Sequence, residues 1–136
     1  FTAHLSSSRG CPNSCSFCGS QFGKIIRARG PAGIYEEMLQ LHADHQVRHF
    51  IFNDENMLGG TAPRVTAFSE YLLARGERRF TWGGNLYLNM VTPQALSLAR
   101  RAGLCRITLG IESGSPAILK EYHKANELAA LPELVR

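Results

Sequence analysis

The chain has 136 residues, of which 44% are hydrophobic and 19% are charged, and its formal net charge is +4. This composition excludes a disordered, collagen-like or coiled-coil chain, and the length is sufficient for one domain with a buried core. No apolar run approaches the roughly 20 residues that a membrane-spanning helix needs.

Basic residues gather in two short clusters, Lys24–Arg29 and Arg75–Arg79. Such charges usually lie on solvated loops and helix ends, while contact with a phosphorylated or nucleic-acid partner stays open as the alternative. The first residue is Phe1, and neither an initiator methionine nor a signal peptide precedes it. We therefore expect residues 1–136 to form a core domain cut at both ends from a longer protein.

Short apolar runs alternate with helical patterns along the chain. The runs predict strands centred on Leu5, Phe50–Phe52, Phe80–Trp82 and Ile107–Leu109. Apolar residues at helical spacing lie between them, in the sets Ile34/Met38/Leu39/Leu41, Val65/Phe68/Leu72 and Leu96/Ala99/Ala102. The last of these helices has Thr92 as its expected N-cap and Gly103 at its exit, and a fourth is expected to begin at Ser115–Pro116.

Strands that alternate with helices predict an α/β fold with a parallel sheet. Four βα units do not close an eight-stranded barrel of roughly 250 residues, so part of a (β/α) barrel and a small doubly wound sheet both remain. Both architectures bind ligands at the carboxyl ends of their strands. We therefore expect the functional residues in the segments that follow the strands, at 9–18, 53–56, 83–85 and 110–115.

Three of the four cysteines stand in the stretch CPNSCSFC, as Cys11, Cys15 and Cys18. A secreted disulfide framework would spread its cysteines along the chain, so a metal site in a reducing cytoplasm fits better. Three thiolates can hold three irons of a [4Fe–4S] cluster and leave the fourth iron open for another ligand. A zinc site completed by a distant histidine is the alternative, although no histidine stands at finger-like spacing.

This motif resembles that of the radical S-adenosylmethionine (radical SAM) superfamily, in which Cys-x3-Cys-x2-Cys follows the first strand. The aromatic residue before the third cysteine is Phe17 here, and the flanking Ser8–Gly10 and Pro12 resemble the cobalamin-binding and methylthiotransferase-like branch. The resemblance implies a partial TIM barrel of six βα units, of which this chain would hold about four.

The resemblance also implies cofactors and partners. Cys11, Cys15 and Cys18 would ligate the cluster, and the open iron would chelate S-adenosylmethionine, with Phe17 near its adenine. Reductive cleavage would give a 5′-deoxyadenosyl radical that acts on an unknown substrate, in methyl or methylthio transfer or another reaction. An electron donor such as flavodoxin or ferredoxin is implied, and cobalamin would need a missing upstream domain.

Acidic residues follow the second and fourth strands. Asp54 and Glu55 stand where the family often has Gly-Gly-Glu or paired acids that receive the methionine ammonium, and the sequence leaves open which of them points inward. In Gly-Ile-Glu-Ser, which resembles the fourth-strand motif, Glu112 would accept hydrogen bonds from the ribose hydroxyls, beside Ser113. The alternative for Asp54 and Glu55 is an acidic loop without a ligand, and the alternative for the Glu112–Ser113 segment is an ordinary turn.

Other positions are given ordinary roles. The family often places a basic residue after Trp82, but none occurs before Met90, which puts that contact in doubt. Lys124 is interpreted as a helix-end charge, and Cys105 as a small core residue. The competing interpretations of the whole chain are a non-catalytic iron–sulfur or zinc module and a fragment that cannot turn over.

Overall fold

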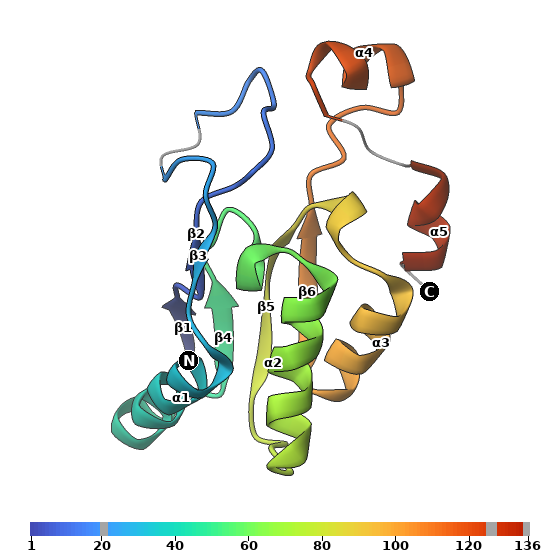
Figure 1. The fold of residues 1–136 in the computed structure, drawn as a ribbon. Coiled ribbons are helices and arrows are strands. Elements are labelled where there is room, and N and C mark those ends of the chain that lie inside the picture. The colour runs from blue at the N-terminus through green and yellow to red at the C-terminus, as the bar shows by residue number, and fades with distance from the viewer. Residues whose placement is uncertain (20–21, 125–127, 135–136) are drawn as a thin grey trace.

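A computed structural model describes residues 1–19, 22–124 and 128–134. Its centre is a parallel four-stranded sheet in the order β1-β4-β5-β6 (Figure 1). The four strands are β1 (Thr2–Leu5), β4 (His49–Phe52), β5 (Thr81–Leu86) and β6 (Leu104–Leu109). The predicted alternation of strands and helices is confirmed, although β5 extends beyond its predicted centre and includes the residues 83–85 that we expected to follow it.

Three helices connect these strands: α1 (Pro31–His45), α2 (Ala62–Ala74) and α3 (Pro93–Arg101). They lie side by side on one face of the sheet, and α2 packs against both neighbours (Figure 1). A doubly wound sheet carries helices on both faces, whereas a barrel carries them only on its outside. The fold is therefore part of a (β/α) barrel, and the face of the sheet without helices corresponds to the barrel interior.

Shorter elements complete the described part of the chain. Strands β2 (Ser8–Arg9) and β3 (Arg27–Ala28) form an antiparallel pair. The remaining elements are η1 (Met57–Gly59), η2 (Leu88–Met90), α4 (Pro116–Glu121), η3 (Leu128–Ala130) and α5 (Leu131–Leu134). None of the helices among the described residues has the length and apolar character that crossing a membrane requires.

The core lies between the sheet and the helices. Phe50, Phe52, Phe68 and Trp82 are each at most 1% exposed, and their rings pack edge to face at centroid distances of 5.2–6.0 Å where Phe52, Phe68 and Trp82 meet. The Trp82 indole donates a hydrogen bond to the carbonyl of Ala102 at 3.0 Å, so its polar atom is satisfied inside the core. This rigid layer fixes the positions of the strand ends.

The start of α3 was predicted correctly from its cap. The Thr92 side chain accepts a hydrogen bond from the backbone N–H of Ala95 at 3.2 Å, and Pro93 occupies the first turn. Gly103 follows the helix with φ +100°, and a Cβ there would lie 2.4 Å from the carbonyl oxygen of Phe80. Only glycine fits this close approach between the helix exit and the start of β5.

Cys105 is not a core residue, contrary to expectation. It is exposed on β6, with its sulfur 3.7 Å from Nδ1 of His49 on β4. The pairing of β5 with β6 is irregular here and skips Cys105, so its direction follows from its neighbours. On β4, Phe50 is buried in the core and His49 beside it lies on the opposite face, so the contact with His49 places Cys105 on the helix-free face.

Candidate functional site

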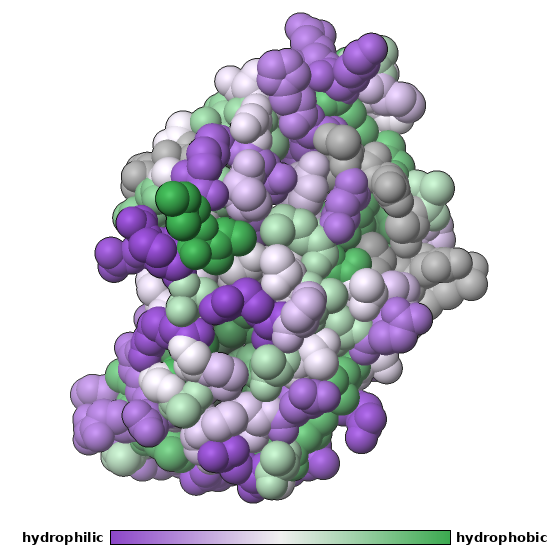
Figure 2. Space-filling view, viewed as in Figure 1, coloured by the Kyte–Doolittle hydropathy of each residue, from purple (hydrophilic) through white to green (hydrophobic). Residues whose placement is uncertain are grey.

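The segments that follow the strands gather at the carboxyl end of the sheet. The loop of residues 10–26, here called the cysteine loop, and the segment around α4 both lie beyond the strand ends in Figure 1. Among the residues whose side chains the structure describes, and apart from Phe1, the large exposed hydrophobic side chains belong to these two segments: Phe17, Phe22, Ile25 and Ile118. Figure 2 shows small apolar patches of this kind within an otherwise mixed surface.

The cysteine loop carries Cys11, Cys15 and Cys18 as free thiols. Its base is closed by a hydrogen bond from the Cys11 N–H to the carbonyl of Gly23 at 3.0 Å. Among the described residues, no three or more histidine, cysteine or acidic side chains are grouped closely enough to hold a metal ion, so the three thiols are not gathered in this structure. They nevertheless share one short loop, which is the first requirement for a common cluster.

Two amide groups are directed at the sulfur of Cys11. The Nδ2 atom of Asn13 lies 3.4 Å from it, and Nδ2 of Asn56 lies 3.5 Å from it. Such amide donors can support a ligating sulfur through hydrogen bonds. Three free thiols on one loop, one of them beside these donors, fit the ligand set of a [4Fe–4S] cluster with one open iron.

The cysteine loop is also attached to the segment after α4, more than 100 positions further along the chain. The Ser16 N–H donates to the carbonyl of Tyr122 at 3.0 Å, and the rings of Phe17 and Tyr122 meet edge to face with centroids 5.3 Å apart. Phe17 itself is 53% exposed. The segments after β1 and β6 thus meet above the sheet, as expected for one site.

Glu112 and Lys124 form an ion pair in this region. Their Oε1 and Nζ atoms are 2.6 Å apart, and the side chains are 33% and 7% exposed respectively. The Lys124 ammonium also lies over the rings of Phe17, at 5.8 Å, and Tyr87, at 5.5 Å from the centroids. Lys124 is therefore a buried cation of the site, and its interpretation as an ordinary helix-end charge was wrong.

The chain reversal after α4 explains how Lys124 becomes buried. His123 has φ +51°, the Lys124 N–H donates to the carbonyl of Leu119, and the His123 N–H donates to that of Lys120. These bonds form a Schellman motif, which turns the chain back over the helix end. Glycine usually occupies the left-handed position, so a histidine there gave no signal in the sequence.

Gly110 leaves room for this ion pair. A Cβ at position 110 would lie 2.6 Å from Oε1 of Glu112 and 2.7 Å from Nζ of Lys124. Glu112 has φ +64°, a left-handed conformation that costs a non-glycine residue roughly 1 kcal/mol. Ser113, by contrast, uses its hydroxyl locally, to accept a hydrogen bond from the Ser115 N–H at 3.0 Å.

Tyr87 stands at the end of β5, where the expected basic residue is missing. Burial raises the pKa of the Tyr87 phenol, and negative charge at Cys15 and Cys11 raises it further. Tyr87 thus lies at this end of the sheet together with Lys124, whose ammonium is over its ring. The cation of the site comes from the segment after β6 and not from β5.

The two acids after β4 are placed differently. Asp54 is 3% exposed, and its carboxylate accepts hydrogen bonds from Ser7, Ser8 and Leu58. Glu55 is half-buried. The structure thus surrounds the Asp54 carboxylate with donors of the chain itself.

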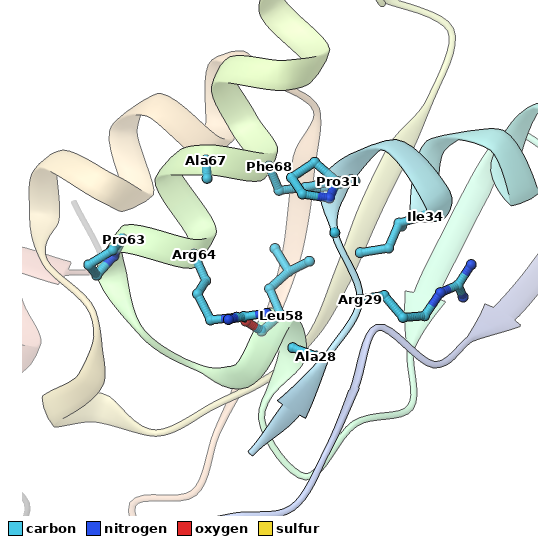
Figure 3. Close-up of a pocket in the computed structure, with 10 residues that line it drawn as sticks. Ala28, Arg29, Pro31, Ile34, Leu58, Pro63, Arg64, Ala67 and Phe68 are labelled. Carbon is cyan, nitrogen blue, oxygen red and sulfur yellow. The ribbon is translucent and has the colours of Figure 1, made fainter.

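A separate cavity of about 270 Å³ lies where α1 and α2 begin (Figure 3). Its two guanidinium groups are already engaged, since Arg29 pairs with Glu37 and Nε of Arg64 donates to the carbonyl of Leu58 at 3.0 Å. Its lining comes from β3 and the segment after it, from η1, and from α1 and α2, and it includes neither the cysteines nor Glu112. We therefore do not include it in the candidate site.

Comparison with known proteins identifies relatives of this chain. It is 33% identical over 132 residues to the anaerobic magnesium-protoporphyrin IX monomethyl ester cyclase of Cereibacter sphaeroides, covering 94% of this chain and 21% of that protein. It is 32% identical over 127 residues to the bacteriochlorophyllide d C-12(1)-methyltransferase of Chlorobaculum tepidum, covering 87% of this chain and 26% of that protein. The chain thus spans about a quarter of the length of these relatives.

Solved structures with this fold include the radical S-adenosylmethionine methyltransferase TsrM from Kitasatospora setae, with a TM-score of 0.84 at 17% identity over 99% of this chain and 26% of that one. The coproporphyrinogen III oxidase of Escherichia coli follows with a TM-score of 0.58 at 14% identity, over 98% of this chain and 33% of that one. The "Radical SAM superfamily" family model matches residues 5–131. With the cysteine loop and the partial barrel described above, this match shows that the chain belongs to the radical SAM superfamily.

Proposed function

We propose that this chain is the core in which a radical SAM enzyme binds and cleaves S-adenosylmethionine. The observation that carries the proposal is the attachment of the cysteine loop, which carries three free thiols, to the segment of the Glu112–Lys124 pair through Ser16 and Phe17. When bound, a [4Fe–4S] cluster supplies the electron that splits S-adenosylmethionine into methionine and a 5′-deoxyadenosyl radical. Cys11, Cys15 and Cys18 would hold the cluster.

The other residues of the site match the polar groups of S-adenosylmethionine. Lys124 offers a buried ammonium that suits the methionine carboxylate, and Glu112 offers a carboxylate that suits two ribose hydroxyls. Glu55 is our candidate for the methionine ammonium, and Phe17 for contact with the adenine. Ser113 stays a prediction, since its hydroxyl already takes part in the local turn.

We further propose that the whole protein is a methyl-transferring member that uses cobalamin. The support comes from similar proteins: the Chlorobaculum relative is a methyltransferase, and the TsrM structure contains cobalamin and a [4Fe–4S] cluster. Cobalamin would be bound outside residues 1–136, in a longer protein of which these residues form the core domain.

The partners follow from the chemistry. One-electron reduction of a bound cluster requires a donor, and we propose a flavodoxin or ferredoxin in the cytoplasm, where free cysteines persist. A nucleic-acid substrate stays open on a net charge of +4. A zinc or electron-transfer module is the competing function.

The test is anaerobic reconstitution with iron and sulfide, followed by electron paramagnetic resonance. We expect a reduced cluster whose signal changes on addition of S-adenosylmethionine, whereas bound zinc or an unresponsive cluster would refute the proposal. Single alanine variants of Cys11, Cys15 and Cys18 should each lose the cluster. Cys105→Ala is the matched control, because Cys105 lies on β6, away from the cysteine loop, and should keep it.

A further inference from the structure

The junction between β1 and the cysteine loop contains a network of buried polar groups that the sequence did not reveal. Ser7, Ser8, Asp54 and Asn56 are 0%, 6%, 3% and 4% exposed. The two serines directly follow β1 and precede Cys11, whereas Asp54 and Asn56 follow the neighbouring strand β4. Burying four polar side chains is costly unless each of them is hydrogen-bonded.

The Asp54 carboxylate is the centre of this network. Its Oδ1 accepts from the Ser7 N–H at 2.9 Å. Its Oδ2 accepts from the Ser7 hydroxyl, from the Ser8 hydroxyl at 3.0 Å and from the Leu58 N–H at 3.2 Å. Each carboxylate oxygen offers about two acceptor positions, so Oδ2 is fully engaged and Oδ1 is engaged by one donor. The Ser8 hydroxyl also lies 3.0 Å from the carbonyl oxygen of Asn56, its second possible acceptor. Among the ion pairs of the described residues, none involves Asp54.

The serines extend the network to the turn after β4. The Ser7 hydroxyl accepts from the Leu58 N–H at 2.8 Å, and the Ser8 hydroxyl accepts from the Gly59 N–H at 2.9 Å. The same turn contains Asn56, whose side-chain amide lies 3.5 Å from the Cys11 sulfur. The path from Asp54 to Cys11 therefore has two branches, one through the backbone after Ser8 and one through Asn56.

Resting on the function proposed above, we propose that Asp54 is a positioning residue for the cluster. Its carboxylate holds the start of the cysteine loop against the turn 56–59 and so fixes the place of Cys11 at the end of the sheet. Asp54 then acts through Cys11 without touching S-adenosylmethionine. The alternative, which the test separates, is that Asp54 receives the methionine ammonium.

The test compares Asp54→Asn with the wild type, in the intact protein without cluster. Asparagine keeps the shape but replaces one carboxylate oxygen with an NH2 group. In place of Oδ1 this group faces the Ser7 N–H, and in place of Oδ2 it faces the Leu58 N–H, which then keeps only the Ser7 hydroxyl as acceptor. The lost hydrogen bond loosens the junction, and we expect alkylation of Cys11 by iodoacetamide to become about tenfold faster. Alkylation of the exposed Cys18, measured by peptide mass spectrometry in the same sample, should change by less than about twofold.

A matched control and a second variant keep the test decisive. Asp44→Asn removes an exposed carboxylate of α1 that accepts only from Gln40 in the described structure, and it should leave both rates unchanged. If Asp54→Asn does not fold, Ser8→Ala replaces it, because it removes one of the two acceptors of the Gly59 N–H, the other being the Asn56 carbonyl, and leaves Asp54 with other donors. An unchanged Cys11 rate in a folded variant overturns the inference.

A second arm uses the reconstituted protein. We expect Asp54→Asn to lose its cluster to a chelator faster than the wild type, by about the same factor as the alkylation rate rises. An unchanged Cys11 rate with weakened S-adenosylmethionine binding would assign Asp54 to the cofactor and overturn the inference. Failure of the wild type itself to take up a cluster would refute the proposed function, while the alkylation result would still decide the role of Asp54.

Discussion

The burial of the Glu112–Lys124 pair predicts how much each of its two residues contributes to the free energy of unfolding, and which of the two substitutions costs more. Lys124 is only 7% exposed, whereas Glu112 is 33% exposed. Glu112→Gln leaves the more buried charge without its partner, which costs 3–5 kcal/mol for a fully buried pair. The rings of Phe17 and Tyr87 near the ammonium reduce this cost, so we expect a loss of about 2 kcal/mol in the free energy of unfolding.

Lys124→Met should cost less, about 1 kcal/mol, because methionine fills the space and the remaining Glu112 carboxylate can reach water. The double variant should resemble Lys124→Met alone, which corresponds to a coupling energy of about 2 kcal/mol. Urea unfolding of the four cluster-free proteins at neutral pH measures all these values. The reasoning is refuted if Lys124→Met costs as much as Glu112→Gln, or if the coupling is below about 0.5 kcal/mol.

Two further predictions concern the pH dependence and the cysteine loop. Burial raises the pKa of Glu77, but hydrogen bonds from Arg79 outweigh it and lower this pKa to about 2. The Glu77–Arg79 pair therefore contributes its full stabilisation above pH 4.5, the ordinary pKa of glutamate. This contribution is about 2 kcal/mol, because the exposed Arg79 weakens the pair, and it is lost as the pH falls towards the folded-state pKa of about 2. The free energies of unfolding of the wild type and of Glu77→Gln should become equal as the pH falls over this range. A difference between them that does not change with pH would contradict the lowered pKa of Glu77. Gly10 has φ +97°, and a Cβ there would lie 2.2 Å from the carbonyl oxygen of Ile25, so Gly10→Ala should abolish cluster uptake, measured as iron per chain. Gly19→Ala, which meets no atom within 4 Å, should take up iron normally, and equal uptake by both variants would sink the argument.

The fold was largely predictable because its signals are local. Alternating apolar runs and helical patterns gave the order of elements, and the cap at Thr92 gave the start of α3. No local signal in the sequence distinguishes a partial barrel from a doubly wound sheet. The difference depends on which face of the sheet each helix covers, and the right-handed connections fix this face only once the strand order is known.

The candidate site was predictable only in part, for a related reason. Cys11, Cys15 and Cys18 were found because their spacing is itself the signal. Lys124 was missed because its burial depends on a chain reversal with histidine at the left-handed position. Asp54 could not be distinguished from Glu55, because adjacent residues after a strand end carry no periodicity that says which one turns inward.

The arrangement of charges at the site supports the proposed function, because a ligand can compensate the free energy that separating a buried ion pair requires. Removing a buried charge from its partner is expensive, so a ligand binds well when it replaces that partner with an equivalent one. Under the proposed function, the carboxylate of S-adenosylmethionine would take the place of Glu112 beside the Lys124 ammonium, and the ribose hydroxyls would donate to the Glu112 carboxylate. The Asp54 carboxylate differs, because its donors belong to the segment that leads to Cys11 and to the turn after β4. A ligand that took Asp54 would leave the Ser7 N–H without its carboxylate acceptor. The pair therefore suits exchange with a ligand, while Asp54 suits the fixed support of the cysteine loop.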